Sequence, residues 1–136
     1  MKTITITTVI NKPIDQVWEC WTTPESIKQW AFASDDWEVG DVENDLREGG
    51  RFKTNMHAKD NSAGFDFTGK YTVVNKNNEI SYVIDDGRTV QAVFEDLGDK
   101  TKVTQTFEME SVNSEEKQRD GWQSILNNFK KFVEAN

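Results

Sequence analysis

The segment SEEKQRDGWQSILNNFKKFVEA, residues 114–135, decides how this chain folds. Its apolar residues form one stripe at the spacing of an amphipathic helix: Trp122, Ile125, Leu126, Phe129 and Val133. Asn113 with Glu116 three residues later predicts a capping box at the start of this helix. Gly121 in the helix interior indicates that the helix approaches a neighbouring element closely. No other segment predicts a long amphipathic helix, so this one must cover the apolar surface that the rest of the chain builds.

The residues before this helix predict mainly strands. Alternation predicts a first strand at residues 2–10, Pro13 opens a short helix, and Thr23 and Pro24 begin a second one that ends near Trp30. A meander of strands follows between residues 37 and 109, with turns at 47–50, 60–64, 75–78, 85–88 and 98–100. Consecutive strands favour an antiparallel sheet over βαβ units. We therefore predict an α+β fold with a curved antiparallel sheet of about seven strands.

One strand of the meander breaks its own alternation. Phe65, Phe67, Tyr71 and Val73 are expected to share the inward face of the sheet. Gly69 interrupts this apolar row, which predicts a bend or a bulge at that residue.

The predicted sheet and helix leave a space between them. A single helix, about 10 Å wide, cannot fill the concave face of a long curved sheet. From the pattern alone, a solid core and a ligand cavity are equally compatible with the aromatic inward rows. Gln105 is expected to point inward, where its amide needs a ligand, a water or another side chain as partner. The residues predicted to line a cavity are Trp30, Trp37, Phe52, Thr54, Met56, Phe67, Tyr82, Phe94, Gln105, Phe107, Trp122 and Leu126.

Length, charge and cysteine content narrow the class of protein. The 136 residues are expected to form one domain, residues 1–136. The net charge of −8 argues against nucleic acid and anionic membranes as partners. Cys20 is the single cysteine, so no intrachain disulfide can form. The absence of a possible disulfide and of a recognisable signal peptide favours the cytoplasm. The absence of a long apolar run predicts no stable membrane insertion.

Few residues could be catalytic or bind a metal, and for each of them an ordinary position on the surface or in a turn is the better explanation. His57 is the only histidine, and its parity places it on the solvent face, away from Cys20. One His and one Cys far apart do not form a transition-metal site. The Asp pairs at 35–36 and 85–86 fall in turns, where Asp is favoured locally. Gly49 and Gly50 lack the features of a phosphate loop. We therefore predict no catalytic residue, metal ligand or cofactor.

Seven short segments make the chain recognisable by their order and spacing: PIDQVW (13–18), TTPE (22–25), QW (29–30), NDLREGGRF (44–52), GKY (69–71), LGDKT (97–101) and GWQSIL (121–126). They resemble the START-like (SRPBCC) superfamily, and residues 45–52 look like the "D-L-R-x-G-G-x-F" signature of one branch. That branch is related to the C-terminal domain of the activator of heat-shock-protein-90 ATPase. The resemblance covers essentially the whole chain.

This resemblance implies a helix-grip fold with a hydrophobic cavity between the sheet and the long helix. Superfamily members bind lipids, polyketides, flavonoid-like molecules and plant hormones, some catalyse reactions in the cavity, and many bacterial members of this branch have no assigned role. The eukaryotic activator adds a separate N-terminal chaperone-binding domain, which a chain of this length is not expected to contain.

Our leading hypothesis is non-enzymatic binding of an apolar small molecule by a monomer or weak homodimer. The first alternative is a stress-related co-chaperone of a heat-shock-protein-90 homologue. The second is a cavity enzyme, a cyclase or hydrolase, which requires an inward-facing polar pair that the pattern does not reveal.

Overall fold

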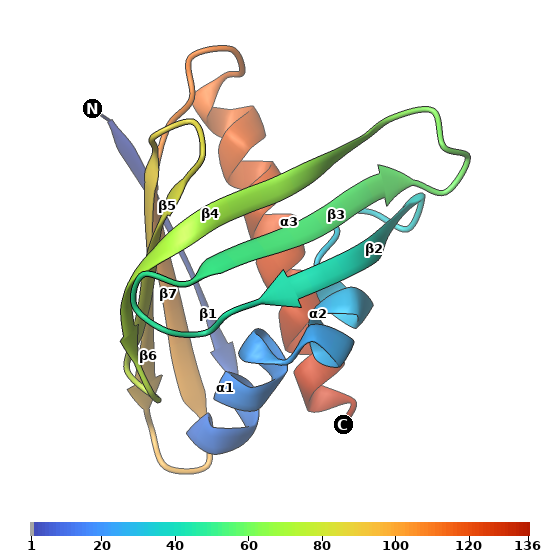
Figure 1. Cartoon of the computed structure of the whole chain (residues 1–136). Coiled ribbons are helices and arrows are strands. Elements are labelled where there is room, and N and C mark those ends of the chain that lie inside the picture. Colours follow the sequence, from blue (N-terminus) through green and yellow to red (C-terminus); the bar gives the residue numbers. More distant parts are fainter. Residues whose placement is uncertain (1) are drawn as a thin grey trace.

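The computed structural model describes residues 2–136 (Figure 1). These residues form seven strands and three helices. In chain order they are β1 (Thr3–Ile10), α1 (Ile14–Thr22), α2 (Pro24–Trp30), β2 (Trp37–Asn44), β3 (Arg51–Ala58), β4 (Gly64–Asn75), β5 (Glu79–Ile84), β6 (Thr89–Asp96), β7 (Thr101–Glu108) and α3 (Glu115–Glu134).

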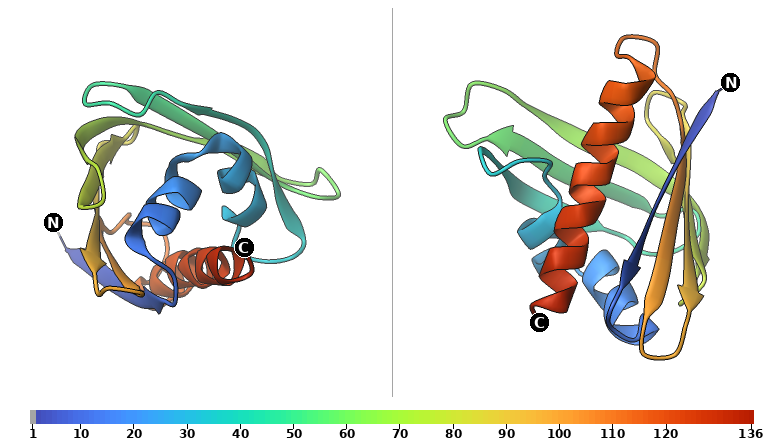
Figure 2. Two further views of the ribbon diagram at one scale, coloured as in Figure 1. Left: turned by 90° about the horizontal axis from the view of Figure 1, so that it is seen from below. Right: turned by 180° about the vertical axis from the view of Figure 1, so that it is seen from behind.

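The seven strands form one antiparallel sheet in the order β1-β7-β6-β5-β4-β3-β2. Each strand from β2 to β7 pairs with its neighbours in sequence, as expected for a meander, and β1 closes the opposite edge beside β7. The sheet curls around the helices, so that α1, α2 and α3 lie inside its concave face (Figure 2). This arrangement confirms the predicted α+β fold with a curved antiparallel sheet around a long C-terminal helix.

Two bulges help the sheet to bend. In β2 the register shifts between Val39 and Val42, and in β4 it shifts between Tyr71 and Val73. An extra residue in one strand increases its local twist and reverses the faces of the residues beyond it. Val74, which pairs with the buried Ile80, therefore takes the inward position. The prediction that Val73 faces inward is wrong for this reason.

The bend or bulge predicted at Gly69 does not occur at that residue. Gly69 stays in regular register opposite Phe52, and the ring of Phe52 lies directly over it. A Cβ atom at Gly69 would lie 2.8 Å from that ring and 2.6 Å from the carbonyl oxygen of Val83. The missing side chain makes room for an aromatic ring on the inner face of the sheet.

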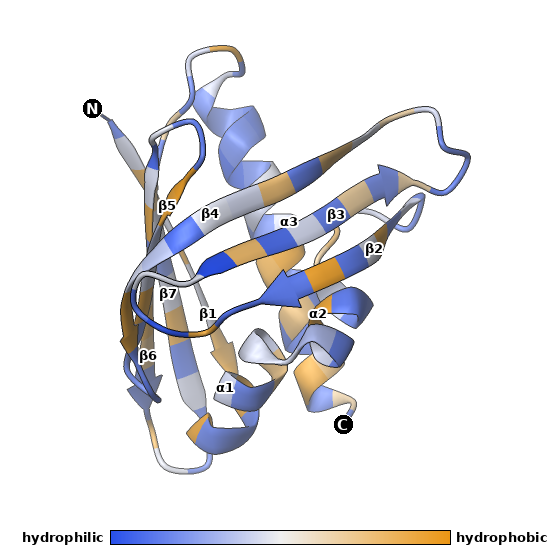
Figure 3. Ribbon diagram, viewed as in Figure 1, coloured by the Kyte–Doolittle hydropathy of each residue, from blue (hydrophilic) through white to orange (hydrophobic). Residues whose placement is uncertain are grey.

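Helix α3 lies along β1 and presents its apolar stripe to the sheet (Figure 3). The guanidinium of Arg119 donates to the carbonyl of Thr5 at 2.9 Å, which ties the helix to that edge strand. The helix begins one residue later than predicted, because Ser114 is the N-cap and its hydroxyl accepts from the backbone N–H of Lys117 at 3.1 Å. The predicted capping box of Asn113 with Glu116 is therefore wrong.

The end of the concave face beside α1 and α2 is filled by aromatic rings. Trp21 packs edge-on against Phe129 of α3, with ring centroids 4.9 Å apart, and lies 5.2 Å from Trp30. Phe94 of β6 contacts both Trp18 and Trp21 at 5.3 and 5.5 Å. Edge-to-face pairs at these distances are favourable beyond the area that they bury. We call these five residues the aromatic cluster; it forms a solid core at this end of the molecule.

Gly121 does not mark a close approach of α3 to another element, as the sequence had indicated. A Cβ atom at this position would have no neighbour within 4 Å. The glycine therefore only costs the helix stability, by about 1 kcal/mol relative to alanine.

We expect Gly121→Ala to raise the free energy of unfolding by about 1 kcal/mol, measured by urea denaturation. Gly69→Ala is the matched comparison, because its methyl group would collide with Phe52 and Val83. That change should lower the free energy of unfolding by about 1 to 3 kcal/mol. A loss of stability on Gly121→Ala would show that an element packs against this side of α3.

Candidate ligand-binding cavity

A cavity of about 290 Å³ lies between α3 and the inner face of the sheet. Rings from β3, β4 and β5 form one wall, and Trp122, Ile125 and Leu126 of α3 form the other. The aromatic cluster closes one end, where Trp21 and Trp30 contribute to the lining. The inner face of the sheet is thus packed at one end and hollow at the other.

Nine of the twelve residues predicted from the sequence lie on the cavity wall. Phe52, Phe67 and Tyr82 pack against one another on the sheet side, with centroid distances between 4.9 and 6.2 Å. The nine residues are Trp30, Phe52, Thr54, Met56, Phe67, Tyr82, Gln105, Trp122 and Leu126.

The other three lie elsewhere. Phe107 is fully buried and stacks on Trp122, with centroids 4.1 Å apart and planes inclined by 11°, so it supports the wall without forming it. Phe94 belongs to the aromatic cluster. Trp37, at the start of β2, does not line the cavity, although its ring lies 6.1 Å from that of Phe65, a half-exposed wall residue.

Eight wall residues were absent from the predicted set: Trp21, Ile27, Ala31, Phe65, Tyr71, Ile80, Arg88 and Ile125. Strand parity already placed Phe65, Tyr71 and Ile80 on the inward face, and Ile125 belongs to the apolar stripe of α3. The residues from α1 and α2 had no such signal, because their position depends on how the two short helices dock. Arg88 was counted only as part of a hairpin turn.

Three polar side chains reach the cavity from the sheet. Thr54, Tyr82 and Gln105 are each less than a tenth exposed. Their side chains form no hydrogen bond with any other residue between 2 and 136. Their polar atoms are not sealed off, since among residues 2–136 the side-chain polar atom that is both fully buried and unpaired is Asn77 Oδ1. They can therefore pair with water or with a molecule inside the cavity.

Tyr71 differs from Tyr82 in having a fixed partner. Its hydroxyl donates to the side-chain oxygen of Asn44, whose amide donates to the carbonyl of Thr22 at 2.7 Å. This chain of hydrogen bonds connects β4, β2 and the last turn of α1. Burial raises the pKa of Tyr71 above its ordinary value. Burial also raises the pKa of Tyr82, which lacks such a partner.

Comparison with known proteins identifies the architecture. A family model described as "Activator of Hsp90 ATPase homolog 1-like protein" matches residues 11–134. The chain belongs to this family. A solution structure of an AHSA1-like protein from Aeromonas hydrophila is 44% identical, with a TM-score of 0.93, and the match covers 98% of this chain and 93% of that one.

Two further structures extend the comparison of this AHSA1-like chain. A solution structure from Cytophaga hutchinsonii is also 44% identical, with a TM-score of 0.85 and coverage of 98% and 93%. A crystal structure from Chromobacterium violaceum shares the fold at 21% identity, with a TM-score of 0.87 and coverage of 97% and 96%. No curated protein matches the sequence.

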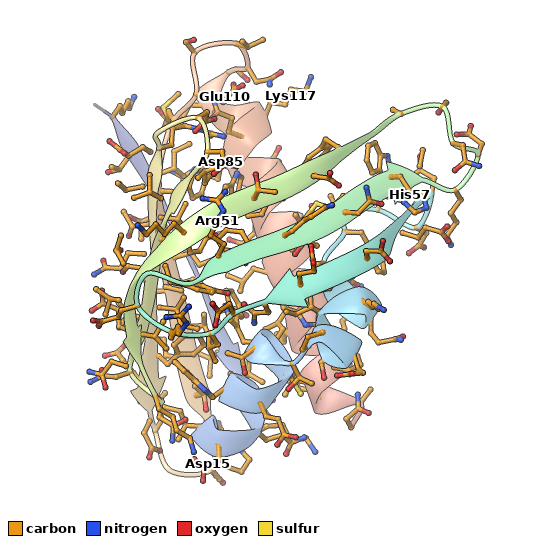
Figure 4. The ribbon with its side chains drawn as sticks, in the orientation of Figure 1. Asp15, Arg51, His57, Asp85, Glu110 and Lys117 are labelled. Carbon is orange, nitrogen blue, oxygen red and sulfur yellow. The ribbon has the colours of Figure 1, made fainter. Side chains whose placement is uncertain are left out.

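The titratable groups of this AHSA1-like chain lie mostly outside the cavity. His57 is on the convex face, where its Nδ1 is 2.8 Å from the side-chain oxygen of Asn55 and its Nε2 is 2.9 Å from a carboxylate oxygen of Glu38 (Figure 4). Burial raises the pKa of the Cys20 thiol, as does the charge of Glu19. Within residues 2–136, no group of three or more His, Cys, Asp or Glu side chains is placed to hold a metal ion.

A helix can cross a bilayer only if it is long and apolar enough. In the part of the chain that the structure describes, no helix has both the length and the apolar character needed to cross a bilayer.

The two tyrosines should remain neutral well above pH 10 in the folded AHSA1-like domain. Their folded-state pKa lies above the unfolded value of about 10, so the stability that they contribute is complete below that pH and is lost as pH rises beyond it. Because Tyr71 and Tyr82 are the only tyrosines, tyrosinate absorbance should appear together with unfolding in an alkaline titration followed by circular dichroism. A tyrosinate signal at the ordinary pKa in a still folded protein would contradict this description of the cavity.

Proposed function

We propose that this chain binds one apolar small molecule, lipid-like, polyketide-like or flavonoid-like, in the cavity between the sheet and α3. One observation carries the proposal: an aromatic-walled cavity of about 290 Å³ has a few polar side chains on its wall that are not hydrogen-bonded to other residues of the described chain. Apolar walls with a few placed polar groups are typical of small-molecule sites, whose volumes begin at roughly 300 Å³. The volume therefore favours a single small ligand.

The wall composition supports binding without catalysis. Rings and aliphatic side chains make up most of the lining, and its polar groups are hydroxyls, indole N–H groups, one amide and one guanidinium. Groups of this kind orient a ligand through hydrogen bonds. Thr54 and Gln105 come from strands on opposite sides of β5, so a molecule between them would contact much of the inner sheet.

A co-chaperone activity is the second candidate. The observation that favours it is the description of the matched family, which refers to an activator of the Hsp90 ATPase. This candidate requires a protein-binding surface and does not require the cavity. Its test is the ATPase rate of a bacterial Hsp90 homologue with and without the purified chain: stimulation would support this candidate, and an unchanged rate would exclude it for that homologue.

Ligand binding should change tryptophan fluorescence, because Trp21, Trp30 and Trp122 lie on the cavity wall. We expect saturable titrations with at least one of decanol, farnesol and naphthol. Thr54→Trp should place an indole in the cavity and weaken binding at least about tenfold, with a loss of stability below about 1 kcal/mol, since a filled core would lose about 1 to 3 kcal/mol on overpacking.

Lys53→Trp is the matched control for this variant. Lys53 is the neighbouring residue of β3 and points to the convex face, near Asp66 at 3.7 Å. It should keep both affinity and stability. Severe unfolding of the Thr54 variant, or unchanged affinity in it, would contradict binding at this site.

A further inference from the structure

Arg88 is the one charged residue among those that line the cavity. It stands directly before β6, two residues from the buried Val90, and therefore shares the inward face of that strand. Its carbonyl accepts from the backbone N–H of Ile84 at 2.8 Å, which continues the sheet pairing to this residue. Only 19% of its side chain is exposed. A guanidinium so placed lies at the margin of the cavity, between the apolar walls and solvent.

The guanidinium of Arg88 is only partly occupied. Its Nε donates to a carboxylate oxygen of Asp86 at 2.8 Å. Its two terminal amino groups form no hydrogen bond with another residue in the range 2–136. Since an arginine has five N–H donors, most of its capacity remains free. The structure therefore places an unused, planar set of donors beside an apolar cavity.

The carboxylates around Arg88 are themselves paired. Asp85 accepts two hydrogen bonds from Arg51, at 2.7 and 2.9 Å, on the outer face of the sheet, where Figure 4 shows the two side chains together. Glu108 accepts from the backbone N–H and the hydroxyl of Thr89 at 2.7 and 2.8 Å. These contacts hold both carboxylates outside the cavity, so they leave the inward side of Arg88 open.

The polar groups deeper in the cavity fit the same ligand. Tyr82 pairs with Val90, so it lies on the row next to Arg88, and Gln105 pairs with Ala92, one row further along the strand. The positive charge of Arg88 also acts on Tyr82, whose pKa it lowers against the larger effect of burial. A ligand oxygen near Arg88 would thus be within the same part of the wall as the unpaired Tyr82 hydroxyl.

We propose that the ligand is an amphipathic monocarboxylic acid, with its carboxylate on Arg88 and its apolar body between Trp122 and the rings of the sheet. The inference rests on the proposed ligand-binding function and specifies the chemistry of that ligand. A carboxylate matches the planar donors of arginine through two parallel hydrogen bonds. A phosphate monoester, with nearly two negative charges, fits less well beside one arginine and three carboxylates in a chain of net charge −8.

The test compares two matched pairs of probes by tryptophan fluorescence near pH 7: decanoate with decanol, and naphthylacetate with naphthylethanol. Each pair shares its apolar body and differs in its head group. A hydrogen bond to a charged group changes affinity by roughly ten- to a hundredfold. We expect the wild-type chain to bind each acid more tightly than its alcohol by at least about tenfold.

Arg88→Gln should remove this preference and leave the affinity for the alcohols unchanged. Arg88→Lys keeps the charge and should restore part of the preference. Lys53→Gln is the matched control, because it removes one positive charge from the outer face without disturbing the carboxylates around Arg88, and it should retain the preference in full. If Arg88→Gln does not fold, the wild-type preference should still fall with added salt, while alcohol binding does not.

The outcomes separate the two proposals. Saturable binding of the alcohols without any preference for the acids would overturn the carboxylate inference and leave ligand binding standing. A preference for the acids that survives Arg88→Gln in the folded variant would also overturn it. Failure of all four probes to bind would contradict ligand binding by this cavity itself.

Discussion

The one long helix, α3, is too narrow to cover the concave face of a seven-stranded sheet. This mismatch in size determines where the interior is packed and where a cavity remains. Helix α3 lies along β1 and is tied to it by the bond from Arg119 to the carbonyl of Thr5. The sheet then continues through six more strands that the helix cannot cover alone. Helices α1 and α2 fill one end of the remaining space through the aromatic cluster. The other end has no further helix, and the cavity is located there.

The rings that bound the cavity are held by other rings, so the cavity can persist without collapsing. Trp122 is fixed by its stacking on Phe107, and Phe52 is held against Tyr71 and Tyr82 with centroids 5.2 and 4.9 Å apart. Gly69 allows the ring of Phe52 to lie flat against the sheet. Contacts of this kind between large rings favour fixed side-chain positions along the wall.

Strand parity and helical periodicity predicted the fold and most of the cavity wall. The inward row of β3, including Phe52, Thr54 and Met56, is placed as the sequence indicated, because its alternation is uninterrupted. Prediction failed where the backbone departs from regular pairing. The bulge in β4 turns Val74 inward in place of Val73, and strict alternation along the sequence cannot show such a bulge.

Other differences depend on packing between elements. Phe94 and Phe107 have the inward parity of wall residues, yet the docking of α1 and of α3 covers them with Trp18, Trp21 and Trp122. Arg88 illustrates the opposite case, in which a residue of a turn becomes part of the wall. Sequence reasoning interpreted it through the hairpin alone, although its spacing of two residues from Val90 gives it the inward parity of β6.

Because the aromatic cluster lies at one end of the sheet, different residues serve the packing of the helices and the shape of the cavity. The rings that join α1 to β6, α2 and α3 lie in the cluster, whereas much of the cavity wall comes from β3, β4 and the middle of α3. Replacements at Thr54, Met56 or Phe67 can therefore alter the shape of the cavity while the cluster remains intact. Under the proposed binding function, such a division lets one scaffold acquire new ligand preferences through few substitutions, because folding does not have to be re-established each time.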